Sequence, residues 1–359
     1  MMPRPMKPFT YVAQSPRVVF GSGSLARLPE ELDRLGLRRA LVLSTPGQRA
    51  LADRVAALLG ERAAGVFAGA VMHVPQDAVL QAREAARAVG ADGAVAVGGG
   101  STTGLGKAIA LASGLPIVAV PTTYAGSEMT PIYGITEGGL KKTGREAQVL
   151  PRTVVYDPEL TLGVPAHLSI TSGINAIAHA AEGLYSADGN PVMDLMAQEG
   201  IAAFARSLPA IHANPRDIEA RSQALYGAWL CGTVLGNVGM ALHHKLCHTL
   251  GGSFNLPHAE THTIVLPHAL AYNAPAAPEA MARIARALGA SDAAQGVYDL
   301  AAANGAPTAL RDIGLREEDV DRACEIALQN QYPNPRPLEA EGIRALLRDA
   351  YEGRRPRAS

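Results

Sequence analysis

Short apolar runs that alternate with helical stretches constrain the first half of this chain most strongly. The runs at residues 94–97 (AVAV) and 116–120 (PIVAV) are apolar at successive positions, so both faces of each predicted strand must be buried. Two further strands and three helices complete the alternation, at residues 39–44, 64–71, 48–59, 77–89 and 105–112. This order predicts a parallel sheet with helices packed on both of its faces.

The pattern changes after about residue 165, where long windows rich in alanine and leucine predict helices. These windows cover residues 169–185, 191–208, 218–249 and 278–288. The strand-like run at residues 263–266 is too short and isolated to build a sheet. We therefore predict two domains within the 359 residues, an α/β domain over residues 1–163 and an all-helical domain over residues 164–359.

The composition argues against several classes of protein. The formal net charge of −1 gives no electrostatic reason to expect nucleic acid or an anionic membrane as a partner. Cys231, Cys247 and Cys324 form no CxxC pattern, which favours a reducing compartment over a disulfide framework or a thiolate zinc site. Residues 1–8 lack the apolar segment of a signal peptide, and no uncharged apolar run is long enough to span a membrane. A cytoplasmic enzyme is predicted.

A glycine-rich string, Gly98, Gly99, Gly100 and Ser101, stands between a predicted strand and a predicted helix. Glycines in this position let backbone N–H groups approach a pyrophosphate, and the helix N-terminus adds partial positive charge. Lys107, on the first two turns of that helix, is placed to meet a phosphate or a nicotinamide ribose. The string departs from GxGxxG at its last glycine, so a simple tight turn is the alternative interpretation.

Two further polar positions follow predicted strands at the same edge of the sheet. Thr122 and Thr123 come after the run at residues 116–120 and offer hydroxyl groups to a ribose or an adenine. Thr45 stands where dinucleotide-binding folds often place an acid against the ribose 2′-hydroxyl. Because no carboxylate is there to repel a 2′-phosphate, NADH and NADPH both remain open. The loops together predict a Rossmann-like dinucleotide-binding domain.

The helical half contains histidines at helical spacing. Asn175 and His179 are four residues apart, as are His244 and His248, and His258 follows after the glycine pair at residues 251–252. Imidazoles that converge from two helices and a loop outline a metal site, but a divalent ion favours a carboxylate where this chain has Asn175. A lone histidine is more often a packed structural group, and we assign that role to the histidines without such partners: His73, His167, His212 and His268. His262 is four residues after His258, but without a clear helix there we assign it a structural role too.

Three longer strings connect these motifs: GGGSTTGLGKAIAL at residues 98–111, PTTYAGSEMTPIYGITE at 121–137, and HHKLCHTLGGSFNLPHAETH at 243–262. With FGSG at residues 20–23 and NPR at residues 334–336, they resemble the iron-containing alcohol dehydrogenase superfamily over nearly the whole chain. Within it they are most similar to the maleylacetate reductase branch. The resemblance implies a dehydroquinate synthase-like architecture, with an α/β nucleotide-binding domain followed by an all-helical domain, and a homodimer.

The resemblance also bears on the metal. Metal-dependent members of the superfamily have an aspartate where Asn175 stands, histidines at the positions of His179, His244 and His258, and usually an aspartate near Gly104. Because the charged ligand is missing here, we expect no metal. The resemblance implies that the enzyme uses NADH or NADPH to reduce the conjugated C=C of maleylacetate, a small dicarboxylate, to 3-oxoadipate during the degradation of aromatic compounds.

For this reaction we expect His244 and His258 nearest the reacting atoms, with Asn175 and His179 orienting the substrate. A dicarboxylate favours a cationic pocket, for which His179, His244, His248 and His258 would serve, with His243 or Lys245 as weaker candidates. The alternatives are a metal-dependent alcohol dehydrogenase of the same fold, a dehydroquinate synthase-like lyase, and a nucleotide-binding regulatory protein. Bound iron or zinc would favour the alcohol dehydrogenase, and turnover without net consumption of cofactor would favour the lyase. The four clustered polar side chains argue against the regulatory protein, because a protein that only binds a nucleotide needs no such set.

Overall fold

The structure, a computed structural model, describes residues 8–138, 140–329 and 332–357. Residues 1–7, most of the segment in which we predict no signal peptide, lie outside the described residues. The α/β half is built on a six-stranded sheet in which every pairing is parallel. Across the sheet the strands are β1 (Arg17–Phe20), β8 (Thr153–Tyr156), β5 (Ile117–Pro121), β4 (Gly93–Gly98), β2 (Ala40–Leu43) and β3 (Ala63–Phe67).

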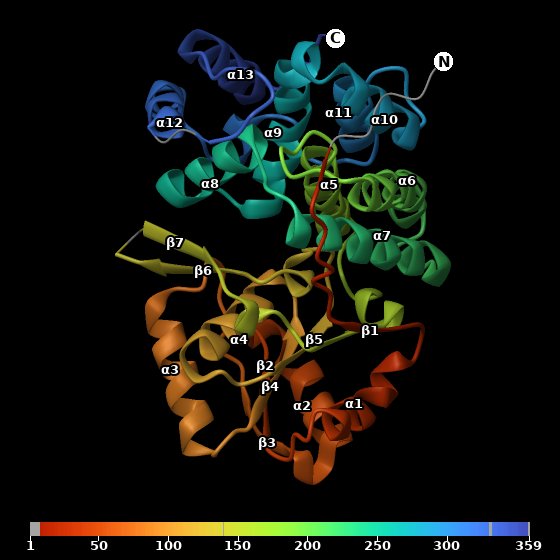
Figure 1. Ribbon diagram of the computed structural model, residues 1–359, viewed down its shortest axis with the longest axis vertical. Coiled ribbons are helices and arrows are strands. Elements are labelled where there is room, and N and C mark those ends of the chain that lie inside the picture. Colours follow the sequence, from red (N-terminus) through yellow and green to blue (C-terminus); the bar gives the residue numbers. More distant parts are fainter. Residues whose placement is uncertain (1–7, 139, 330–331, 358–359) are drawn as a thin grey trace.

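Helices cover both faces of this sheet, as the apolar runs predict (Figure 1). Along β4, Val95 and Val97 pack toward α1 (Leu28–Arg34) and α2 (Arg49–Leu59). Ala94, on the opposite face, packs with α3 (Gln76–Ala88) and α4 (Gly100–Ser113). Successive side chains of a strand point to opposite faces, so a strand covered on both sides must be apolar throughout.

An antiparallel hairpin, β6 (Ile132–Glu137) and β7 (Leu140–Arg145), projects beside the sheet and was not predicted. Its sequence is polar and has no run that would bury both faces. The edge strand β1 and its neighbour β8, each four residues long, were not predicted either. Short strands depend on pairing with distant residues and leave a weak local pattern.

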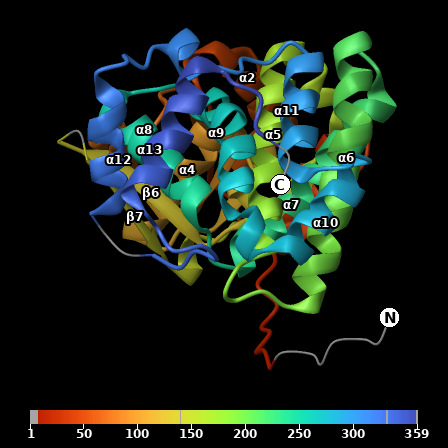
Figure 2. The same cartoon turned by 90° about the horizontal axis from the view of Figure 1, so that it is seen from above.

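The second half is all-helical over its described residues, as predicted. Its helices are α5 (Ala166–Gly183), α6 (Pro191–Ala213), α7 (Ile218–Asn237), α8 (Leu242–Phe254), α9 (His258–Asn273), α10 (Pro278–Leu288), α11 (Ala293–Ala303), α12 (Asp319–Leu328) and α13 (Ala340–Glu352). Figure 2 shows α5 at the centre, between α9 on one side and α6 and α7 on the other. We propose the division between residues 163 and 164, just before α5, as the domain boundary.

One helical prediction needs correction, and the strand-like run forms no sheet, as predicted. The single helix expected at residues 218–249 is broken into α7 and α8, because the buried carboxylate of Glu182 accepts hydrogen bonds from the N–H groups of Ala241 and His243 and so caps a new helix start. The run at residues 263–266 lies inside α9. Taken singly, none of the described helices is long and apolar enough to cross a membrane; α7 and α8 pass that test only as a pair, bent by 96°.

Candidate active site

A cavity of about 640 Å³ lies between the carboxyl edge of the sheet and the helical half. The α/β half contributes the loops that follow β2, β3, β4 and β5, and the helical half contributes the beginnings of α5 and α9. Six residues predicted to bind the cofactor line it: Thr45, Gly99, Gly100, Ser101, Thr122 and Thr123. Asn175 and His258 line the same cavity from the helical side. Ligands of open parallel sheets bind at this edge.

The glycine turn leaves no room for side chains. Gly98 has a φ of +149°, which favours glycine, and a Cβ on Gly99 would lie 2.9 Å from the Thr123 hydroxyl oxygen. The helix begins at Gly100, five residues earlier than predicted, so its N-terminal N–H groups face the cavity. Gln48, which the sequence did not single out, lines the cavity and donates a hydrogen bond of 2.9 Å to the Thr122 hydroxyl. This arrangement can hold a pyrophosphate against backbone N–H groups.

The structure places Lys107 elsewhere, which corrects the prediction that it meets a phosphate or ribose. Its side chain is buried, and its amine donates hydrogen bonds to the Ser127 carbonyl (2.6 Å), the Thr130 hydroxyl (2.9 Å) and the Ile132 carbonyl (2.7 Å). Burial lowers the pKa of this amine to about 7. Lys107 therefore stabilises the loop at residues 127–132 and does not present a cation to the cavity.

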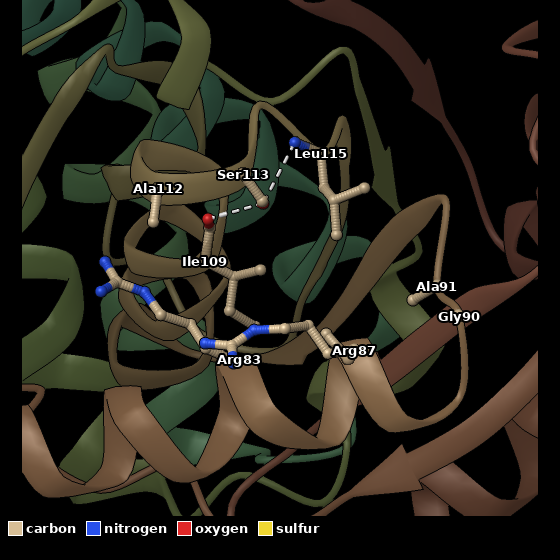
Figure 3. Close-up of a pocket in the computed structure, with 9 residues that line it drawn as sticks. Arg83, Arg87, Gly90, Ala91, Ile109, Ala112, Ser113 and Leu115 are labelled. Atoms are coloured by element: carbon tan, nitrogen blue, oxygen red, sulfur yellow. Dashed lines mark hydrogen bonds between the residues drawn. The ribbon is translucent and has the colours of Figure 1, made fainter.

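A second, smaller cavity of about 240 Å³ lies between α3 and α4 (Figure 3). Arg83 lines this cavity and donates a hydrogen bond of 2.7 Å to the Ala108 carbonyl. The surrounding residues, such as Ile109 and Leu115, are mainly apolar, and no predicted site residue lines this cavity. It has the character of a packing hollow between two helices.

The helical half brings its histidines together. His179 of α5 and His244 of α8 have ring centroids 5.0 Å apart, and His244 and His248 are separated by 6.1 Å. His258 lies 4.3 Å from His262, which in turn lies 5.0 Å from His244. The predicted residues thus converge in one cluster, and Asn175 lies on the same face of α5 one turn before His179.

His262 stands inside this cluster, which corrects its assignment to a structural role. It is fully buried, and its Nδ1 lies 3.0 Å from Nε2 of His243, a residue ranked only as a weaker candidate. Its spacing of four residues from His258 is visible in the sequence, but the helix that gives this spacing its meaning, α9 from His258 onward, was not predicted. His73, also assigned a structural role, lines the cavity.

Glu182 is the functional residue that sequence reasoning missed entirely. Its carboxylate is fully buried and lies 2.7 Å from His244 Nδ1. The same carboxylate accepts backbone N–H groups from the start of α8. Glu182 is seven residues after Asn175, two helical turns along the same face. It holds His244 so that Nε2 is the ring nitrogen left for other contacts.

Four polar atoms of the histidine cluster and its neighbour Asn175 are buried without a hydrogen-bond partner among the described residues. Asn175 Oδ1, His179 Nδ1, His244 Nε2 and His262 Nε2 are buried and have no hydrogen-bond partner among the described residues. Burial lowers the pKa of His179, His243 and His262 well below the usual value for histidine, and the neighbouring histidines lower it further. A lowered pKa disfavours the positive charge that we expected on His179.

Comparison with known proteins identifies the family of this chain. The family model described as iron-containing alcohol dehydrogenase matches residues 15–158, and the one described as Fe-containing alcohol dehydrogenase family, C-terminal, matches residues 169–351. The chain belongs to the iron-containing alcohol dehydrogenase family. It is an oxidoreductase with the dehydroquinate synthase-like architecture predicted for that family.

Within this family the chain is similar to maleylacetate reductases. It is 63% identical over 351 residues to the maleylacetate reductase of Burkholderia cepacia, covering 98% of this chain and 100% of that protein. The solved maleylacetate reductases of Agrobacterium tumefaciens and of Rhizobium sp. strain MTP-10005 superpose with a TM-score of 0.94, at 55% and 56% identity. Each comparison covers 98% of this chain and 100% of the solved chain.

The family name raises the question of a metal ion. The donors at the family's metal positions are here the amide of Asn175 and the imidazoles of His179, His244 and His258, which include no anionic ligand. Divalent iron favours a carboxylate beside its histidines, whereas zinc is also held by three histidines and a water molecule. His243, Cys247 and His262 also have their ligand atoms within 4.8 Å of one another, and burial raises the pKa of the Cys247 thiol well above its usual value. The set at Asn175 therefore lacks the carboxylate that iron favours, but its three imidazoles match the donors of a zinc site.

Proposed function

We propose that this chain reduces the conjugated C=C of maleylacetate to 3-oxoadipate with NADH or NADPH and without a metal ion. The observation that carries the proposal is the full-length similarity to maleylacetate reductases, at 63% identity to the Burkholderia cepacia protein. The amide of Asn175 at the charged metal position supports the metal-free part. The homodimer, the cytoplasmic location and the absence of nucleic-acid and membrane partners stay predictions.

The glycine turn and the loops around it would hold the nicotinamide cofactor. Gly99, Gly100 and Ser101 offer backbone N–H groups to the pyrophosphate, and Thr45, Thr122 and Thr123 offer hydroxyl groups to the nucleosides. The cavity extends from these loops to Asn175 and His258, so both cofactor and substrate have a place in it. When bound, the reduced nicotinamide supplies a hydride.

The histidine cluster would stabilise the charge that the reaction creates. Addition of hydride to an alkene conjugated with a ketone places negative charge on the enolate oxygen, and a carbon atom must then be protonated. Imidazole N–H groups can donate hydrogen bonds to that oxygen and can act as a general acid. We assign these tasks to His244 and His258, with Asn175, His179 and His248 orienting the substrate. An enone is already activated, whereas an unactivated alcohol needs a Lewis acid.

Purified, metal-analysed protein mixed with maleylacetate and NADH or NADPH tests the proposal. We expect oxidation of the reduced cofactor at the same rate with and without EDTA. Turnover that needs added Fe²⁺ or Zn²⁺, or oxidation of simple alcohols abolished by a chelator, would favour a metal-dependent alcohol dehydrogenase instead. The buried, unpartnered donors Asn175 Oδ1, His179 Nδ1 and His244 Nε2 are the observation that favours this second candidate.

His258→Ala is expected to lower kcat/KM for maleylacetate by about a hundredfold, the usual contribution of a general acid or charge-stabilising group. The residue begins α9 and lines the cavity, so its removal affects the reacting end and leaves the glycine turn intact. Steady-state kinetics measure the effect. His212→Ala, at an exposed position late in α6, serves as the control. A value within a few-fold of the parent would remove His258 from the mechanism.

Gly99→Ala is expected to raise KM for NADH by about tenfold, because the new methyl group must displace the Thr123 hydroxyl 2.9 Å away. The helical domain is untouched, so kcat at saturating cofactor should change little. Gly252→Ala is the matched control, since a Cβ at that position in α8 meets nothing within 4 Å. Equal KM values in both variants would show that the turn tolerates a side chain.

A further inference from the structure

We propose that His73 binds one carboxylate of the dicarboxylate substrate, from the wall of the cavity that belongs to the α/β domain. The inference rests on the proposed function and adds a substrate-binding residue to it. The substrate has a carboxylate at each end of its chain, so two separate parts of the site must supply donors. The histidine cluster on α5, α8 and α9 accounts for one of them.

His73 lies where the two halves of the protein meet. Residues 72–74, in the loop between β3 and α3, line the cavity together with Asn175 and His258 of the helical half. The His73 ring also reaches toward α8, since a Cβ on Gly251 would lie 3.9 Å from its Cε1. Gly251 is three residues after His248, so His73 faces the helix that contributes most of the cluster.

The backbone holds this side chain in place at a conformational cost. His73 and Val74 have φ values of +65° and +50°, the left-handed region that a β-branched residue such as Val74 rarely adopts. Thr136 fixes both residues, because its hydroxyl donates to the His73 carbonyl (2.7 Å) and its N–H donates to the Val74 carbonyl (3.0 Å). Strain of this kind persists where the surrounding structure enforces it, and it is concentrated at binding sites.

Val74 fills the space beside Gly104 with an apolar group, since a Cβ on Gly104 would lie 2.8 Å from Val74 Cγ2. An apolar side chain at that point does not repel a substrate carboxylate. Among residues 72–74, which line the cavity, the adjacent imidazole of His73 is the polar side chain.

His73 is the basic side chain that the α/β half contributes to the described lining of the cavity. The cavity must accept a pyrophosphate and two carboxylates, yet none of its described lining residues is lysine or arginine, and Glu260 adds a negative charge. Lys107 is buried against the loop at residues 127–132 and does not line the cavity. The described basic side chains that line the cavity are His73, from the α/β half, and His258, from the helical half. Backbone N–H groups of the glycine turn can hold the pyrophosphate, and an imidazole N–H of His73 can donate a hydrogen bond to a carboxylate.

His73→Asn tests the inference, because asparagine adopts the left-handed region readily while its shorter side chain cannot reach as far. We expect KM for maleylacetate to rise about tenfold, with kcat within about twofold of the parent and KM for NADH unchanged. His73→Gln, which keeps a longer N–H donor, should recover part of the loss. His212→Asn on the surface of α6 is the control, and thermal melting of each variant checks the fold.

The outcomes separate this inference from the proposed function. If the parent protein does not turn over maleylacetate, the proposed function fails and the inference fails with it. If the parent is active and His73→Asn and His73→Gln keep its KM for maleylacetate, the inference alone is overturned. A rise in KM for NADH in place of maleylacetate would also overturn it, because His73 would then serve the cofactor phosphates.

Discussion

Glu182→Gln is expected to lower kcat by about a thousandfold, by analogy with the loss seen when a buried carboxylate that orients a catalytic histidine is replaced by an amide. The carboxylate lies 2.7 Å from His244 Nδ1 and is fully buried. An amide at this position can present an N–H to the ring and so favour the wrong tautomer of His244. The loops that we propose hold NADH are in the α/β half of the chain, so KM for NADH should stay close to the parent value.

A double-mutant cycle distinguishes orientation from damage to the fold. Glu182 also caps α8, accepting the N–H groups of Ala241 (2.9 Å) and His243 (2.8 Å), so some fall in thermal stability is expected. If Glu182 acts through His244, adding Glu182→Gln to His244→Ala should lower kcat little further. Losses in kcat that simply multiply would show that Glu182 acts independently of His244, for instance by supporting α8.

Asn175→Asp is expected to convert the cluster into a divalent metal site. The change is nearly isosteric and adds the missing anionic donor beside His179, His244 and His258, so one equivalent of Zn²⁺ or Fe²⁺ should be retained after dialysis. Without metal, a carboxylate buried to this depth should lower the free energy of unfolding and repel the substrate. Reductase activity of the metal-free variant is therefore expected to fall by at least about tenfold.

Metal analysis and isothermal titration calorimetry measure the gain in affinity. Asn190→Asp is the matched control, because Asn190 is also buried but caps α6, where aspartate is equally suitable. Equal metal content in the parent and in Asn175→Asp would contradict the argument. Such a result would mean either that the parent already binds the ion through neutral donors or that the cluster cannot close around one.

Much of the fold could be predicted because its signals are local. The strand at residues 94–97 is apolar on both faces, and that pattern alone implies a covered parallel sheet, which the structure confirms. The spacing of Asn175 and His179 follows from helix geometry and needs no knowledge of the partner helix. The prediction failed where helix boundaries were uncertain, since His262 joins the cluster only because α9 begins at His258.

The sequence by itself determined the layers of the fold, the glycine turn and the histidines of one helix face, because each depends on neighbours along the chain. Only the tertiary structure decided which distant groups meet. Glu182 binds N–H groups about sixty positions away on α8, and no local pattern marks that contact. Lys107 is buried against the loop at residues 127–132 and turned away from the cofactor cavity for the same reason. A buried polar group settles where its hydrogen bonds are satisfied, and the packing of the whole chain determines where that is.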